Sequence, residues 1–195
     1  MKKDIIYQAL MTTGRQLVRE KGIDFLTARK LSDASKHSVG TIYNQFSNMD
    51  KLILAQNMQT LDELYAKLLK IVPDNDSYKN LNRYLDGFVS YVLTNQNLWF
   101  LLYNFHLNAK NKLPTTYLKK LIRATSLWQL HFDIVFKKLS NKEKSLAKQV
   151  LWLSLFSVSS FLTTPTLDGF GHINKKNICK LLLNTYLAGL TTLKR

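Results

Sequence analysis

Long stretches without helix-breaking residues are the feature that most constrains the fold of this chain. Only seven glycines and three prolines interrupt its 195 residues. Together they make up about 5 % of the chain, against roughly 12 % in average proteins. Folds with many strands need frequent turns, which favour these two residue types. The shortage therefore favours long helices, and no segment shows the sustained apolar–polar alternation that would predict a strand.

The apolar periodicity and the helix-end signals predict an all-α protein with nine helices. Gly22 suits the position just past a helix end. Thr27, Ser38 and Ser47 suit N-caps, and Leu26 and Leu31 are spaced for a hydrophobic staple around Thr27. Breaks are expected at Lys110–Pro114 and Thr163–Gly171. We expect helices at about 4–21, 28–35, 38–45, 49–71, 77–95, 97–109, 114–139, 142–162 and 174–193.

The net charge is the first indication of function. Lys and Arg outnumber Asp and Glu by 28 to 13, which gives +15 at pH 7. Such a balance predicts an anionic partner, either nucleic acid or a lipid surface. The densest basic region is Lys110 to Lys148, which contains ten basic residues and only two acidic ones. That region can be a solvated surface, or it can attract an anionic ligand or DNA.

Several functional classes find no support in the sequence. The single cysteine, Cys179, permits neither an intramolecular disulfide nor a multi-cysteine metal site. None of the four histidines has the spacing with Glu that marks a zinc peptidase helix, and no phosphate-binding glycine loop is present. We therefore predict no enzyme, no catalytic residue, no metal and no cofactor. No signal peptide or membrane span is recognisable, so we expect a cytoplasmic protein.

Residues 27–46 carry the most information about function. They predict two short helices joined by a tight turn at Lys36-His37, which is the plan of a helix-turn-helix. The second helix of this motif enters the DNA major groove and reads base edges. Four apolar residues are expected to face inward, namely Leu31, Ala34, Ile42 and Phe46. The side chains of Ser38, Val39, Thr41, Asn44 and Gln45 are expected to stay outside.

The residues expected outside have the chemistry that DNA requires. Asn and Gln can bind adenine, Ser and Thr can bond several base edges, and Val39 suits a thymine methyl group. Gly40 lets the backbone approach the duplex, and Tyr43 can donate a hydrogen bond to phosphate. The predicted DNA-binding residues are Thr27, Arg29, Lys36, Ser38, Val39, Gly40, Thr41, Tyr43, Asn44 and Lys51.

This segment resembles the N-terminal domain of the TetR family of transcriptional regulators. The resemblance covers about residues 4–55, and its Gly-Thr-Ile-Tyr-x-x-Phe core is specific. It rests on Glu20-Lys21-Gly22, Phe25, Thr27, Arg29, Leu31, Ala34, Ser38-x-Gly40-Thr41-Ile42-Tyr43-x-x-Phe46 and Lys51-Leu52. The chain departs from the family where Lys36-His37 replaces a frequent Gly-Val and Val39 replaces a frequent Lys. Phosphate affinity must then come from Arg29, Lys30, Lys36, Lys51 and the first helix.

The resemblance implies a two-part architecture. Residues 1–50 would form a three-helix DNA-binding domain, and residues 51–195 a larger helical domain for effector binding and dimerisation. An effector pocket is expected among the central aromatic helices. Its candidate lining residues are Tyr84, Phe88, Trp99, Tyr103, His106, Trp128, Gln129 and Trp152. The last two helices are expected to pair with those of a second copy through Val150, Leu153, Ser157, Leu182, Tyr186 and Leu190.

The resemblance further implies a ligand-released repressor that binds a palindromic operator in double-stranded DNA as a homodimer. The effector is an unknown small molecule. Two alternatives stay open on charge alone. One is a nucleic-acid binder without sequence preference. The other is a helical protein of anionic membrane surfaces, for which the region from Lys110 to Lys148 is the candidate.

Overall fold

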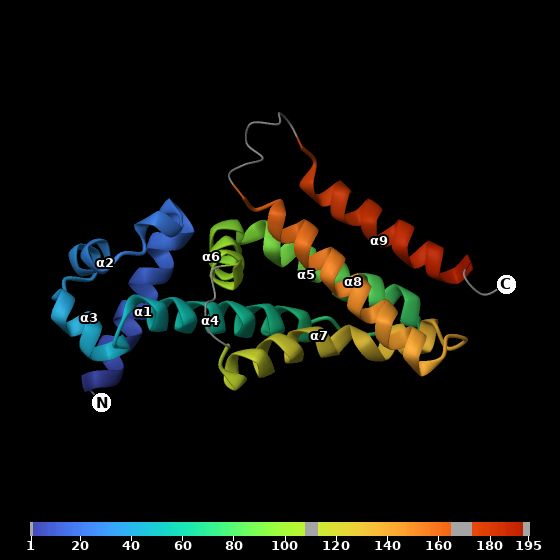
Figure 1. Ribbon diagram of the computed structural model, residues 1–195, viewed down its shortest axis with the longest axis horizontal. Helices are drawn as coiled ribbons and strands as arrows, with labels where there is room; N and C mark the ends of the chain where they lie inside the picture. Colours follow the sequence, from blue (N-terminus) through green and yellow to red (C-terminus); the bar gives the residue numbers. More distant parts are fainter. Residues whose placement is uncertain (1, 108–112, 165–172, 193–195) are drawn as a thin grey trace. The chain divides into compact units, whose positions relative to one another are not determined.

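The computed structural model describes residues 2–107, 113–164 and 173–192, and every regular element in these ranges is a helix (Figure 1). The all-α prediction is therefore confirmed for the described part of the chain. The elements are α1 (Lys2–Lys21), η1 (Ile23–Phe25), α2 (Ala28–Ser35), α3 (Val39–Phe46), α4 (Met49–Leu69), α5 (Ser77–Thr94), α6 (Gln96–Leu107), α7 (Thr115–Val135), α8 (Asn141–Phe161) and α9 (Lys175–Thr192).

The helix ends agree with prediction to within a few residues. Gly22 ends α1 with φ +88°, and its N–H donates to the Val18 carbonyl over 2.9 Å. Helix α7 ends four residues before its predicted end, and the chain continues as turns in which Phe136 and Leu139 are still buried. The apolar pattern of the sequence therefore continues beyond the end of α7. Most of the breaks expected at Lys110–Pro114 and Thr163–Gly171 lies outside the described residues.

The chain divides into two compact units. The N-terminal unit comprises Met1–Leu61 and Asn95–Pro114, and the C-terminal unit comprises Asp62–Thr94 and Thr115–Arg195. Helix α4 contributes residues to both, and α6 belongs to the N-terminal unit although it follows α5. The domain boundary after residue 50 stays a prediction.

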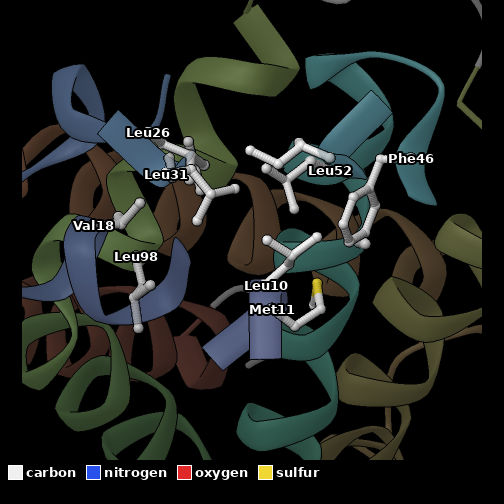
Figure 2. Close-up of a cluster of buried hydrophobic side chains, with 11 residues drawn as sticks. Leu10, Met11, Val18, Leu26, Leu31, Phe46, Leu52 and Leu98 are labelled. Atoms are coloured by element: carbon white, nitrogen blue, oxygen red, sulfur yellow. The ribbon is translucent and has the colours of Figure 1, made fainter. Parts of the chain in front are cut away.

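The core of the N-terminal unit is an apolar cluster with members from five helices (Figure 2). Leu10, Leu31 and Leu52 are fully buried. Each such leucine contributes roughly 1.5–3 kcal/mol of burial free energy. The predicted staple partners, Leu26 and Leu31, both lie in this cluster, which fixes α2 on α1. The remaining members are Met11, Val18, Ile42, Phe46, Ala55, Leu98 and Leu101.

A buried polar network joins α1 to α4 within this unit. The Arg15 side chain is only 5 % exposed, and its Nη1 donates to the Thr60 hydroxyl over 3.1 Å. Gln56 Nε2 donates to the Met11 carbonyl over 2.8 Å. Because buried polar groups are costly unless bonded, these contacts specify which face of α4 lies against α1.

Helix α6 packs against α1 and η1. Asn97 Nδ2 donates to the Arg19 carbonyl over 3.0 Å, so it satisfies an acceptor in the last turn of α1. This contact spans 78 positions of sequence, and no local pattern could have predicted it.

In the C-terminal unit, α5 packs against α7, α8 and α9. Leu81, Leu85, Phe88 and Val92 line its buried face at the helical spacing of three and four residues. Helix α8 begins with a capping box in which Ser140 and Glu143 satisfy each other's backbone N–H groups. Helices α8 and α9 pack together, and the Tyr186 hydroxyl donates to the Ala147 carbonyl over 2.8 Å.

Candidate DNA-binding surface

Helix α2 has the N-cap that the sequence predicts. Thr27 Oγ1 accepts the Lys30 N–H over 3.2 Å. At the other end, Lys36 adopts the left-handed conformation with φ 59°. Glycine often occupies such a position, and a lysine there costs roughly 1–2 kcal/mol. The turn between the two helices therefore forms with Lys36-His37, and the His37 N–H donates to Ser35 Oγ over 3.3 Å.

Helix α3 is capped by Ser38, as predicted. Ser38 Oγ accepts the Thr41 N–H over 3.1 Å, and the two hydroxyl oxygens lie 2.9 Å apart. Ile42 and Phe46 are buried, and the Phe46 ring lies 5.0 Å from the ring of Tyr7 in α1. The core thus holds one face of α3 and leaves the other free.

Two local predictions are wrong. Ala34 is exposed rather than inward-facing, because Leu31 alone supplies the buried residue of the short α2. Ser47 does not cap α4. Its φ is +66°, and its N–H closes α3 by donating to the Tyr43 carbonyl over 2.7 Å. Asn48 takes the capping role instead, since its Oδ1 accepts the Lys51 N–H over 2.9 Å.

The free face of α3 presents the predicted DNA-reading residues. Val39 is 38 % exposed and Tyr43 is 43 % exposed, although hydrophobic side chains of this size are usually buried. Gly40 and Asn44 are exposed, whereas Thr41 and Gln45 are half-buried. A Cβ added at Gly40 would meet only Ser38 Oγ, at an ordinary 3.8 Å. Packing therefore does not require glycine at this position.

Three exposed cationic side chains lie close to α3 in the sequence. Arg29, Lys36 and Lys51 are exposed, and all three belong to the same compact unit as α3. Arg29 lies in the first turn of α2 and Lys51 in the first turn of α4, where backbone N–H groups favour anions. These residues have the charge and the location that phosphate contacts require.

A lysine–phenylalanine cluster beside α2 was not foreseen. Lys30 Nζ lies 3.7 Å from the centroid of the Phe25 ring and donates to the Asp24 carbonyl over 3.1 Å. Lys21 Nζ lies 5.6 Å from the same centroid. The ring attracts both cations and orders them. The sequence signal was present in the spacing of Lys21, Phe25 and Lys30, but it depends on η1 bringing them together.

The predicted effector-pocket residues fall into two groups. Trp99, Tyr103 and His106 lie on α6 in the N-terminal unit, where burial lowers the pKa of His106. The others lie in the C-terminal unit, on α5, α7 and α8. Three of these, Trp128, Gln129 and Trp152, line one groove between α7 and α8. Phe88 contacts Trp152 with ring centroids 5.1 Å apart, and Tyr84 stacks on His131 at 5.7 Å.

The predicted dimer residues differ in exposure. Val150, Leu153 and Ser157 lie on an exposed face of α8, which Leu146 extends. On α9, Leu190 is buried within the protomer, and Leu182 and Tyr186 are half-buried. The exposed face of α9 runs one residue away, through Ile178, Leu181, Thr185 and Ala188. Both helices thus keep an unpaired face with the three- and four-residue spacing of a helix seam.

These features define a helix-turn-helix fold. Residues 10–55 match the family model described as Bacterial regulatory proteins, tetR family. Residues 10–55 are therefore similar to the N-terminal DNA-binding domain of TetR family transcriptional regulators. The resemblance seen in the sequence is confirmed.

Solved structures share the fold along nearly the whole chain. The TetR family regulator PfmR from Thermus thermophilus is 16 % identical, with a TM-score of 0.66 over 92 % of this chain and 97 % of that one. A protein with unknown function from Rhodococcus sp. RHA1 is 16 % identical, with a TM-score of 0.72 over 94 % of each chain. A possible TetR family regulator from Streptomyces coelicolor A3(2) is 14 % identical, with a TM-score of 0.70 over 95 % and 98 %.

No curated protein matches the sequence significantly. Among the described helices, none is long and apolar enough to cross a membrane. Within the same ranges of the chain, no group of three or more His, Cys, Asp or Glu side chains could hold a metal ion.

Proposed function

We propose that this protein is a sequence-specific transcriptional repressor which binds a palindromic operator as a homodimer and is released by a small-molecule effector. The carrying observation is the exposed face of α3, where Gly40 stands although the free fold has room for a side chain. A close approach of DNA to the backbone supplies the reason for glycine at that site. Such a regulator would act in the cytoplasm, where DNA is accessible.

The proposed reading face combines base-edge and phosphate contacts. Val39 and Asn44 suit a thymine methyl and an adenine edge, respectively. Tyr43, Thr27 and the exposed cations Arg29, Lys36 and Lys51 suit phosphates. Because the phosphate contacts are shared by every sequence, specificity rests on the few side chains of α3.

The exposed apolar faces of α8 and α9 support the proposed dimer. Leu146, Leu153 and Leu181 are each more than 60 % exposed, which is a costly surface for a free monomer. Two copies related by a two-fold axis would bury both faces in a four-helix bundle. The two α3 helices would then read half-sites one DNA turn apart, about 34–36 Å, or a multiple of that distance.

Helix α4 supports the proposed coupling between effector and operator. Its first half is packed with α1 through Gln56 and Thr60, and its second half belongs to the C-terminal unit. An effector that binds one arrangement of α4 better than another shifts the population toward that arrangement. Release follows when the favoured arrangement holds the two reading helices at the wrong spacing.

The test is a titration of the full chain into labelled DNA from upstream of its own gene. A scrambled duplex of the same length and composition is the control, and both are measured at two salt concentrations. Specific sites bind roughly 10³–10⁷ times tighter than random DNA. An upstream fragment that binds more tightly than the scrambled duplex by a factor of that order supports the proposal. Equal affinity for every upstream fragment and its scrambled control, with a steep salt dependence, would instead indicate a general basic binder.

A further inference from the structure

A groove of about 290 Å³ lies between α7 and α8 of the C-terminal unit. Trp128 and Gln129 line it from α7, and Lys148, Gln149 and Trp152 line it from α8. Small-molecule pockets typically measure about 300–1,000 Å³. The groove therefore suits a ligand of one or two rings rather than a large one.

The two indole rings of the groove are held in place by other aromatic side chains. The Trp152 ring centroid lies 5.1 Å from that of Phe88 and 5.8 Å from that of Phe156. The Trp128 ring lies 5.9 Å from Phe132 in an edge-on arrangement. Aromatic walls that are already ordered lose little entropy on binding, and they favour a flat aromatic ligand.

Trp128 contributes an aromatic wall to the groove rather than a hydrogen bond. The residue is 3 % exposed and its Nε1 is buried, so the indole N–H is out of reach of a ligand in the groove.

Lys148 is the lining residue that can donate to an anion, and Asp133 already offsets part of its charge. Lys148 is the charged residue among the described lining residues, and no carboxylate lines the groove. Its Nζ donates to both carboxylate oxygens of Asp133, over 2.9 and 3.0 Å. An ammonium group has three donors, so this bidentate contact orients Lys148 and leaves a third N–H for a ligand.

We propose that the groove binds a small planar aromatic carboxylate. The carboxylate would accept from Lys148 Nζ, and the ring would lie against Trp128 and Trp152. This inference rests on the proposed function, because it names the chemical class of the effector.

The probes are 2-naphthoate, benzoate and the neutral 2-naphthamide, titrated calorimetrically into the full chain. We expect saturable binding of 2-naphthoate with one site per chain. Hydrogen bonds to a charged group are roughly twice as strong as neutral ones. The amide should therefore bind about tenfold more weakly, which corresponds to about 1.4 kcal/mol.

Two substitutions in the Lys148–Asp133 ion pair distinguish a role of Lys148 in ligand binding from a role in holding α7 and α8 together. Lys148→Met and Asp133→Asn both break the contact between α7 and α8. We expect Lys148→Met to weaken 2-naphthoate about tenfold and to leave 2-naphthamide unchanged. Asp133→Asn should strengthen 2-naphthoate, because it frees the Lys148 ammonium from its competitor. Equal losses in both variants would mean that the pair only holds the helices together, and would overturn the proposal.

Two aromatic substitutions provide a second comparison. Trp128→Phe removes part of an aromatic wall of the groove, so it should weaken 2-naphthoate several-fold. Tyr78→Phe changes an exposed aromatic residue that does not line the groove and should have no effect. The proposal fails if neither 2-naphthoate nor benzoate binds saturably, or if the two variants behave alike.

The operator assay keeps this inference distinct from the proposed function. If 2-naphthoate binds the groove and operator affinity is unchanged at saturation, the aromatic carboxylate site stands and ligand release fails. If operator binding is specific but no aromatic carboxylate binds, the regulator stands and the assigned ligand class fails.

Discussion

At the scale of single residues, Gly40 distinguishes a requirement of DNA from a requirement of the fold. We expect Gly40→Ala to leave the free energy of unfolding unchanged or to raise it by about 0.5–1 kcal/mol, because alanine favours a helix. Operator affinity should fall at least tenfold, since the added methyl group separates α3 from the duplex. Thermal unfolding and fluorescence anisotropy measure the two effects.

Gly14 is the matched control for that substitution. A Cβ there would lie 3.2 Å from Gln56 Nε2 and 3.2 Å from Leu26 Cδ1. Gly14→Ala should therefore lower the unfolding free energy, by about 1–3 kcal/mol if the core cannot adjust. Similar stability losses in both variants would contradict the distinction drawn for Gly40.

His106 gives a prediction about pH. Burial lowers its pKa in the folded chain, so the unfolded chain binds more protons near pH 6. The contribution to stability is complete above the unfolded pKa of about 6.5, and it is lost as the pH falls toward the folded value. Urea unfolding should give a lower free energy of unfolding at pH 5.5 than at pH 7.5. His106→Gln should make this difference smaller. If His106→Gln loses as much unfolding free energy as the wild type, protonation of His106 does not cause the pH dependence. His37→Gln is the control variant.

At the scale of elements, the helix caps give opposite predictions for two adjacent residues. Asn48→Ala removes the bond to the Lys51 N–H and should cost about 1 kcal/mol. Ser47→Gly relieves a positive φ of 66° and should stabilise the protein by up to about 1 kcal/mol. Denaturant unfolding measures both changes. A destabilised Ser47→Gly with an unchanged Asn48→Ala would restore Ser47 as the cap.

The caps also show how far sequence reasoning reaches. Thr27 and Ser38 were predicted because a cap acts on a neighbour three residues away, and local sequence contains both partners. Ser47 and Asn48 are both good caps, so the choice between them depended on how α3 ends. Ala34 was misplaced because its apolar type fitted the helical spacing, whereas the orientation of α2 buries only Leu31.

Sequence reasoning gives no prediction where the partners of a contact are distant in sequence. The placement of α6 beside α1 depends on contacts such as Asn97 with Arg19. The apolar residues of α9 form two overlapping sets, each with helical spacing. Only tertiary packing decides which set of residues faces the interior. Leu183, Leu187 and Leu190 are buried within the protomer, whereas Leu181 is exposed.

At the scale of the whole molecule, the exposed face of α8 predicts a dimer that one charge can break. Leu153 is 61 % exposed, and Leu153→Glu should give a monomer in sedimentation velocity together with a large loss of operator affinity. Leu130 on α7 is 65 % exposed and is the control, so Leu130→Glu should leave the assembly unchanged. The interface lies elsewhere if the first variant stays dimeric or the second dissociates.

Helix α4 is one continuous helix with residues in both compact units. Its 21 residues contain neither glycine nor proline, and its polypeptide runs through both compact units without a break. Each residue inserted between Leu61 and Asp62 would rotate the following residues of α4 by about 100° about the helix axis and shift them by about 1.5 Å. Seven inserted alanines would return those residues to within about 20° of their original direction. A series of insertions can therefore measure how much torsional alignment, as opposed to mere attachment, DNA reading demands.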